Sequence, residues 1–512
     1  MSISGLILLS AVAGGVVWLL PRSRPGIVRW TALVASVVVF LAALMLWNQY
    51  DSGNSGMQLE ENCVWIAALG VSYHVGVDGL SVFLILLTTF LTPLAVLISW
   101  NSITEKVAGF MAALLWLQAA MLGVFVALDL ILFYVFWEAM LVPMYFIIGI
   151  WGGEQKLKAT VIFVLYTMVG SVLMLVSMVS LALLCQPATG GLTFDLTAID
   201  ISVITLSQQL WLCLAFLLAF AIKVPLFPFH TWLPLAHVEA PTAGSVILAG
   251  VLLKTGSYAI LRFCFPLFPE AIVVVAPYMQ TLAVVGIIYG ALVSFVQEDF
   301  KKLVAYSSVS HMGFIILGMF ALNVEGVTGG VIQMVNHGVS TGGLFLCVGM
   351  LYERSHTRRF DELGGIGNTM PVYAGLFLII TLSSVGLPGL NGFVGEFLAL
   401  AGAFAGSNPW FAVVGTSGVI LAAVYLLWMY QRVVYGTEPG DLRQPWPDLN
   451  LRELVTLVPI VVMTVWIGLF PSSFLGVVEG SAEKLIKGVN AAQTEALDTD
   501  ARLAESRMEP RR

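Results

Sequence analysis

Charged residues are scarce in this sequence. Only 10% of its 512 residues are charged, while 59% are hydrophobic. Soluble globular proteins carry about 25% charged residues, so an ordinary soluble multidomain protein is excluded. The net charge of −7 also excludes the basic surface that a nucleic-acid partner would require. The composition therefore predicts a membrane protein with no nucleic-acid partner.

Recognisable metal, redox and nucleotide motifs are absent. The five cysteines are scattered without C-x-x-C spacing, which indicates no iron–sulfur or zinc site. The patterns G-x-G-x-x-G, G-x-x-x-x-G-K-[ST] and H-E-x-x-H do not occur. We therefore expect no cofactor and no metal in this chain. Any redox chemistry that it serves must then lie in other chains.

Long apolar runs fill most of the sequence, and their length of about 20 residues is what a helix needs to cross a bilayer. They predict an all-α polytopic membrane protein with about 14 transmembrane helices. No basic region precedes the first run, which favours a retained span over a cleaved signal. The expected spans are 4–20, 28–47, 78–99, 107–127, 130–151, 158–185, 209–238, 242–265, 271–296, 300–322, 326–352, 371–404, 410–434 and 452–472.

Basic residues are concentrated in alternate loops, and the opposite loops carry only Arg262. By the positive-inside rule the basic loops are cytoplasmic, so both termini are expected on the outer side. The tail, about 473–512, is amphipathic and then polar, and we expect it at the surface. The basic loop residues are Arg22, Arg24, Arg29, Lys106, Lys156, Lys158, Lys301, Lys302, Arg354, Arg358, Arg359, Arg432, Arg443 and Arg452.

Six ionisable residues lie well inside the apolar runs. A charged side chain at this depth costs roughly 2.5–3.5 kcal/mol on insertion scales. Each could be a hydrogen-bonded structural group, because most buried polar groups are. Two lysines and two glutamates in one chain instead favour an ion or proton pathway. The six are Glu138, Lys223, Lys254, His311, His337 and Glu396.

Two of the expected spans are interrupted by helix-breaking residues. Broken helices leave backbone groups unpaired, which is tolerated only where protein or water satisfies them. Interruptions at corresponding positions of two halves are typical of inverted-repeat transporters. The breaks are Pro225, Pro228 and Pro234 in the seventh span, and Gly386, Pro388, Gly389 and Gly392 in the twelfth.

The broken span is the fourth of five in both spans 4–8 and spans 9–13. Five is an odd number, so the second unit would start from the opposite side of the membrane. This spacing predicts two inverted five-helix repeats that conduct protons between them. The alternative interpretation is a symmetric scaffold without conduction. The expected domains are an N-terminal three-helix segment (1–106), the first repeat (107–265), the second repeat (271–435) and a last helix with the tail (436–512).

Three segments carry a specific resemblance. They are FPFHTWLPLAHVEAPTAGSVILAGVLLKTGSYAILRF, VFWEAMLVPMYFIIGIWGG and VGLPGLNGFVGEFL. With them the chain resembles, from about residue 70 to 435, the antiporter-like subunits of proton-translocating NADH-quinone oxidoreductase, respiratory complex I. Glu396 stands where other members of the family usually carry lysine. The long lateral helix of the largest member is also not found after the last span. Both features resemble the member that carries glutamate at this position. Leu235 departs from the acidic residue of many relatives, at a position that varies in the family.

The resemblance implies a role for each buried group. Glu138 would pair with Lys223, the lysine of the first broken helix, and Lys254 would be the next lysine of a proton line. His311 and His337 would relay protons to Glu396, the terminal carrier. His230 and His237, which flank the first break, are either proton-uptake groups or structural.

The resemblance also implies partners and a place. NADH, FMN, iron–sulfur clusters and quinone would belong to partner subunits, whose quinone reduction drives the pump. The partners would include two further antiporter-like subunits in the membrane arm. The chain would lie in the lipid bilayer of a bacterial inner membrane and move protons from the cytoplasm outward. Protons per cycle, the exit route and the type of quinone stay open.

A switch is the expected mechanism. Burial weakens the hold of a lysine on its proton, and a nearby carboxylate strengthens it. The distance between Glu138 and Lys223 could therefore control proton release toward Lys254. The rival is an Mrp-type antiporter that exchanges Na⁺ or K⁺ for protons. Ser383 and Ser384 precede the second break, but no buried aspartate joins them there.

Overall fold

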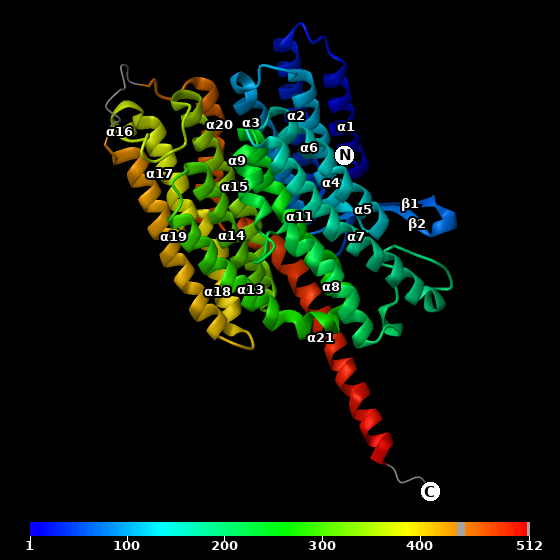
Figure 1. Cartoon of the computed structure of the whole chain (residues 1–512). Coiled ribbons are helices and arrows are strands. Elements are labelled where there is room, and N and C mark those ends of the chain that lie inside the picture. Colours follow the sequence, from blue (N-terminus) through cyan, green and yellow to red (C-terminus); the bar gives the residue numbers. More distant parts are fainter. Residues whose placement is uncertain (438–445, 509–512) are drawn as a thin grey trace.

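The computed structural model describes residues 1–437 and 446–508, with the backbone alone at 493 and 495–508. The chain is a helical polytopic membrane protein (Figure 1). Its first elements are α1 (Ile3–Leu19), α2 (Pro25–Gln49), β1 (Gln58–Ile66), η1 (Ala67–Leu69), β2 (Val71–Val77) and α3 (Val82–Ser102). The next are α4 (Val107–Val126), α5 (Leu130–Ala139), α6 (Leu141–Trp151), α7 (Lys156–Thr189), η2 (Ile201–Val203), α8 (Leu206–Lys223) and α9 (Trp232–Glu239).

The remaining elements make up the second half of the bundle. They begin with α10 (Thr242–Ile247), η3 (Leu248–Leu252), α11 (Leu253–Ala259), η4 (Ile260–Cys264), α12 (Phe265–Leu267), α13 (Pro269–Phe295) and α14 (Phe300–Met319). They end with α15 (Val324–Ser355), α16 (Ile366–Thr369), α17 (Pro371–Val385), α18 (Asn391–Ala405), α19 (Trp410–Tyr435), α20 (Leu451–Leu469) and α21 (Ser472–Met508).

Twelve spans in the described part are long and apolar enough to cross a bilayer. The expected first span corresponds to α1, and the expected twelfth to the pair α17 and α18; all three helices are shorter. The total of about 14 crossings and the inverted repeats therefore stay predictions. In the span Thr242–Leu267 and in α15 the most apolar 18 residues are all buried in the bundle, so Lys254 and His337 lie in its core.

Loops that the sequence predicts for one side lie together at one end of the bundle. Arg29, on α2, donates a hydrogen bond to the carbonyl of Ile103, which follows α3. Trp151, at the end of α6, donates one to the carbonyl of Glu105. Which side of the membrane this end faces stays a prediction. Arg443, one of the basic residues counted for it, lies outside the described residues.

A β-hairpin fills a stretch for which the sequence indicated no structure. Strand β1 pairs antiparallel with β2, with Asn62 opposite His74. The hairpin projects from the side of the bundle (Figure 1). His74 of β2 attaches it, because Nδ1 of the ring lies 2.8 Å from Asp195 in the segment before α8. The other ring nitrogen lies 3.1 Å from Glu60 within the hairpin.

The predicted amphipathic tail forms one long helix, α21. Its first turns pack on the bundle through buried Phe474, Val478 and Ala482. The hydroxyl of Ser481 accepts a hydrogen bond from the backbone of Gly79. The C-terminal part of the helix projects away from the bundle (Figure 1). Residues 509–512 of the predicted tail lie outside the described part.

Candidate functional site: a row of buried ionisable groups

Lys223 is the last residue of α8, and Pro225 and Pro228 follow it in the turn before α9. Its side chain is 1% exposed, and its ammonium has no hydrogen-bond partner in the described part. The ammonium instead lies 5.2 Å from the ring centre of Trp137 and 5.7 Å from that of Phe163. Aromatic faces attract cations within about 6 Å, so the two rings partly replace the lost hydration.

Glu138 lies on α5, beside Trp137, and is partly buried. One of its carboxylate oxygens is buried and finds no hydrogen-bond partner in the part of the chain that the structure describes. Within the described residues it forms no ion pair with Lys223 at 4.0 Å or less. Since the ammonium of Lys223 lies beside Trp137, the residue before Glu138, the two groups are neighbours without direct contact.

Lys254 sits at the centre of the molecule, between two π-helical turns. The turn η3 precedes it and η4 follows it. Such turns inside helices are frequent at functional sites. The ammonium of Lys254 donates to the carbonyl of Ala249, five residues earlier in η3. It also lies 2.6 Å from Nδ1 of His337 on α15, which joins the two halves of the chain.

The line continues from His337 into the second half. The ring centres of His337 and His311 are 6.0 Å apart. Nδ1 of His311, on α14, lies 2.8 Å from Oε1 of Glu396 on α18. All four groups from Lys254 to Glu396 are at most 3% exposed. The structure thus brings Lys254, His337, His311 and Glu396 into one row.

Glu396 and His311 are held by two neutral side chains. The amide of Gln333 donates to Oε1 of Glu396 at 3.1 Å. The hydroxyl of Tyr425, on α19, lies 3.1 Å from Nε2 of His311. Oε2 of Glu396 and Nε2 of His337 are buried and have no hydrogen-bond partner among the described residues. Both residues line a cavity of about 10 Å³, on the order of the room that one water molecule requires.

The second break shapes this part of the row. α17 ends at Val385, and the next residue, Gly386, has a φ of +84° that side chains disfavour. Asn391 begins α18, accepts a hydrogen bond from Ser383 and exchanges hydrogen bonds with Asn336. These side chains supply partners where the helix ladder is interrupted, as a break inside a membrane requires.

The two candidate uptake histidines have different surroundings. His230 lies in the turn between α8 and α9, with its ring 4.9 Å from Tyr289 and 5.8 Å from Phe227. His237, on α9, is fully buried and stacks on Phe345 at 4.6 Å. Neither ring nitrogen of His237 has a hydrogen-bond partner in the described part. Phe345 belongs to α15, the helix that also carries His337, so His237 packs against a helix of the row.

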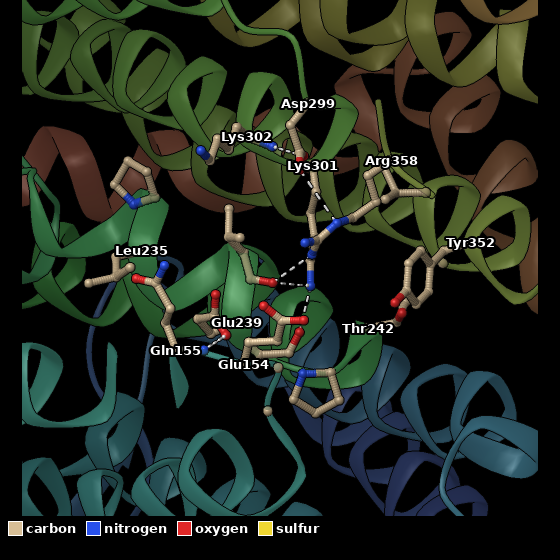
Figure 2. Close-up of a pocket in the computed structure, with 18 of the residues that line it drawn as sticks. Glu154, Gln155, Leu235, Glu239, Thr242, Asp299, Lys301, Lys302, Tyr352 and Arg358 are labelled. Atoms are coloured by element: carbon tan, nitrogen blue, oxygen red, sulfur yellow. Dashed lines mark hydrogen bonds and ion pairs between the residues drawn. The ribbon is translucent and has the colours of Figure 1, made fainter. Parts of the chain in front are cut away.

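A chamber of about 770 Å³ opens against α9, whose residues Leu235 and Glu239 line it together with residues of the basic loops (Figure 2). Both acidic and basic side chains line its wall, so the chamber can hold water. Charged residues that line it are Glu154, Glu239, Asp299, Lys301, Lys302, Glu353 and Arg358. A wet chamber at this position could lead protons toward the row.

Sequence reasoning missed several residues of the site. Gln333 and Asn336 precede His337, and Ser340 and Thr341 follow it, at spacings that place all five on one face of α15. That polar stripe in an apolar span was a readable signal. Tyr425 had no such signal, because one tyrosine in an apolar helix is ordinary. Lys301 was counted as a loop cation, yet it is 6% exposed.

Comparison with known proteins gives a consistent result. Residues 127–422 match the family model described as NADH:quinone oxidoreductase/Mrp antiporter, TM. The chain is 47% identical to NADH-quinone oxidoreductase subunit M of Rhodobacter capsulatus, over 90% of this chain and 91% of that protein. It is 43% identical to NADH-ubiquinone oxidoreductase chain 4 of Arabidopsis thaliana, over 95% and 97%.

Solved structures agree with these relatives. A chain of respiratory complex I from Thermus thermophilus with bound NADH matches with a TM-score of 0.86 and 35% identity, covering 95% of this chain and 99% of that one. A chain of the Mrp complex from Dietzia sp. DQ12-45-1b has a TM-score of 0.81 at 20% identity, covering 95% and 99%. The second likeness concerns the fold alone.

Proposed function

This chain belongs to the NADH:quinone oxidoreductase/Mrp antiporter transmembrane family, and we propose that its buried row conducts protons across the membrane arm of respiratory complex I. It is a membrane subunit of proton-translocating NADH-quinone oxidoreductase, of the kind called subunit M in bacteria and chain 4 in mitochondria. The catalysed reaction is that of the whole complex.

One observation carries the proposal: ionisable groups from both halves of the chain meet in a single buried row. The ammonium of Lys254 contacts His337 at 2.6 Å, and His311 contacts Glu396 at 2.8 Å. Buried charges are costly unless they are paired or functional. A scaffold would gain nothing from such a row, whereas a proton can pass along hydrogen-bonded groups that each bind and release it.

The switch at Lys223 is the second part of the proposal. The carboxylate of Glu138 acts on Lys223 from beyond direct contact, and the rings of Trp137 and Phe163 lie beside the ammonium. The observed separation of the two groups would then be the state in which Lys223 releases its proton. Approach of the carboxylate would strengthen the hold of Lys223 on its proton, and retreat would release the proton toward Lys254.

Uptake and exit complete the path. Protons would enter through the chamber, with His237 and His230 as uptake groups, and would leave beyond Glu396 on the outer side. Moving one charge against 100 mV requires about 2.3 kcal/mol. That energy would come from quinone reduction in partner subunits, which hold the FMN and iron–sulfur clusters that oxidise NADH.

The place of the chain in the cell follows from the same proposal. It would lie in a bacterial inner membrane with both termini outside, next to two further antiporter-like subunits. The concentration of basic residues in alternate loops supports this orientation. Direct contact of His311 with Glu396 supports a proton path rather than a sodium site, because a sodium site needs several oxygen ligands around the ion.

Purification of the native assembly tests the proposal against its rival. A tagged chain should bring down flavin- and iron–sulfur-containing subunits, and the preparation should reduce quinone with NADH. Reconstituted in vesicles, it should acidify one side when NADH is added. Recovery with small membrane proteins alone, together with Na⁺/H⁺ exchange that needs no NADH, would instead support the Mrp-type antiporter.

A further inference from the structure

The end of α9 is held by two cations that come from later parts of the chain. Nζ of Lys301, in the first turn of α14, lies 2.5 Å from the carbonyl oxygen of Ala240 and 3.4 Å from that of Val238. Nη1 of Arg358 donates to the same Val238 oxygen at 2.8 Å. The last carbonyls of a helix lack partners within it and form the negative end of its dipole. The two cations meet this need (Figure 2).

Lys301 is unusual among the charged residues of the chamber. It is 6% exposed, yet in the described part no carboxylate lies within 4.0 Å of its ammonium. A buried charge needs partners, and its partners here are the carbonyls at the end of α9. The next residue, Lys302, is exposed in the same chamber and contacts Asp299 only through its backbone. The side chain of Lys301 therefore binds the end of α9, whereas Lys302 contacts Asp299 through its backbone.

Helix α9 separates the chamber from His237. Leu235, Val238 and Glu239 line the chamber, while His237 is fully buried on the other face and stacks on Phe345. The position of α9 therefore decides how the imidazole lies between the chamber on one side and α15, the helix that carries His337, on the other. Prolines and a turn precede α9, so its hydrogen-bond ladder is not continuous with that of α8.

We propose that Lys301 is a positioning residue whose ammonium latches α9 to α14 and thereby holds His237 between the chamber and α15, the helix that carries His337. The same α14 carries His311 in contact with Glu396, so one helix fixes the uptake wall and the far end of the row. The proposal rests on the proposed function for the role of His237. The latch on α9 can be measured without reference to that role.

Hydrogen exchange in the assembled complex tests the latch. Lys301→Met removes the charge, Lys301→Arg keeps it, and Lys302→Met is the matched control that removes a charge from the same chamber. We expect amide exchange in residues 232–240 to rise roughly tenfold or more in Lys301→Met, since a hydrogen bond to a charged group has this weight. Lys301→Arg should restore most of the protection, and Lys302→Met should match the parent. Unchanged exchange in Lys301→Met, or an equal rise in Lys302→Met, would overturn the latch.

Proton pumping by the same variants tests the consequence for His237. Lys301→Met should lower the ratio of protons to electrons and displace its pH profile, and Lys301→Arg should recover both. In a variant that already carries His237→Gln, Lys301→Met should cause no further loss of pumping, because both changes act through the same imidazole. Additive losses would contradict positioning through His237. Full pumping by His237→Gln alone would contradict the uptake role of His237. It would leave the latch untouched, which only an unchanged amide exchange rate in α9 contradicts.

Discussion

Glu396 uses one carboxylate oxygen for both of its partners, His311 and Gln333, and leaves the other free toward a small cavity. That asymmetry suits a proton carrier, because one oxygen holds the carboxylate in position while the other can bind and release a proton. His337 likewise has one bonded and one free ring nitrogen. Proton transfer at Glu396 and His337 therefore depends on one atom that is fixed by a hydrogen bond and a second atom that is open to a proton.

Replacement of Glu396 tests this division of labour. Glu396→Gln keeps the shape but cannot carry a proton, so we expect the complex to assemble and most proton pumping to be lost. Glu396→Lys retains an ionisable group and should keep partial activity. Pumping per electron in vesicles measures both. A fully pumping Glu396→Gln, or a wholly inert Glu396→Lys in a normally assembled complex, would count against a relay at this position.

The switch at the other end of the path has its own test. Glu138→Ala and Lys223→Ala should each abolish most pumping and slow quinone reduction, because release and rebinding at Lys223 lose their control. Glu325→Ala is a suitable control, since that carboxylate is exposed in the first turn of α15 and remote from the row. Full stoichiometry in Glu138→Ala would rule out the switch.

At the scale of elements, the two helix breaks were readable in the sequence but their partners were not. Pro225 and Pro228 follow the end of α8, and Gly386, Pro388 and Gly389 follow the end of α17. Pro234 and Gly392 were expected to break the same spans, but they lie in the first turns of α9 and α18, where a proline or glycine interrupts no helix. No local rule could show that Gln333 meets Glu396 or that Asn336 meets Asn391, because these contacts join residues far apart in the chain. The six buried groups stood out individually because charge is rare in the spans, whereas their order in space required the fold.

The glycine at the second break offers a matched pair of substitutions. Gly386 has a φ of +84°, and an added Cβ would lie 3.1 Å from Oε2 of Glu396. Gly386→Ala should cost about 1–3 kcal/mol of stability and lower pumping by displacing the carboxylate. Gly375→Ala, on α17, has open space around it and should behave like the parent. The unfolding temperature and the proton pumping of both variants are the measurements. Equal values for Gly386→Ala and Gly375→Ala would show that the backbone geometry of the break is unimportant.

At the scale of the whole molecule, a buried ion pair joins the hairpin to the span that carries Lys254. Nη2 of Arg262 lies 2.5 Å from Oδ1 of Asp78, and both side chains are 7% exposed. Nε of Arg262 donates to Tyr258, whose hydroxyl donates to the carbonyl of Phe125 on α4. The sequence showed Arg262 only as the single basic residue of its side, without its partner.

Removal of one member of this pair should be damaging. Asp78→Leu leaves an unpaired buried cation, which typically costs about 3–5 kcal/mol, so we expect a lower unfolding temperature and poor assembly. The double variant Asp78→Leu with Arg262→Leu should recover much of the loss, because no lone charge is left. Native gels and thermal scans compare them. A double variant that is worse than Asp78→Leu would contradict a simple electrostatic role.

Lys254 provides the most direct test, because it is the group that joins the two halves of the row. The measurement is the number of protons moved per electron in vesicles that contain the assembled complex, with Lys254→Met beside the parent. The account predicts a complex that contains all its subunits but loses the protons carried through this chain. An unchanged ratio in Lys254→Met would contradict conduction along the row.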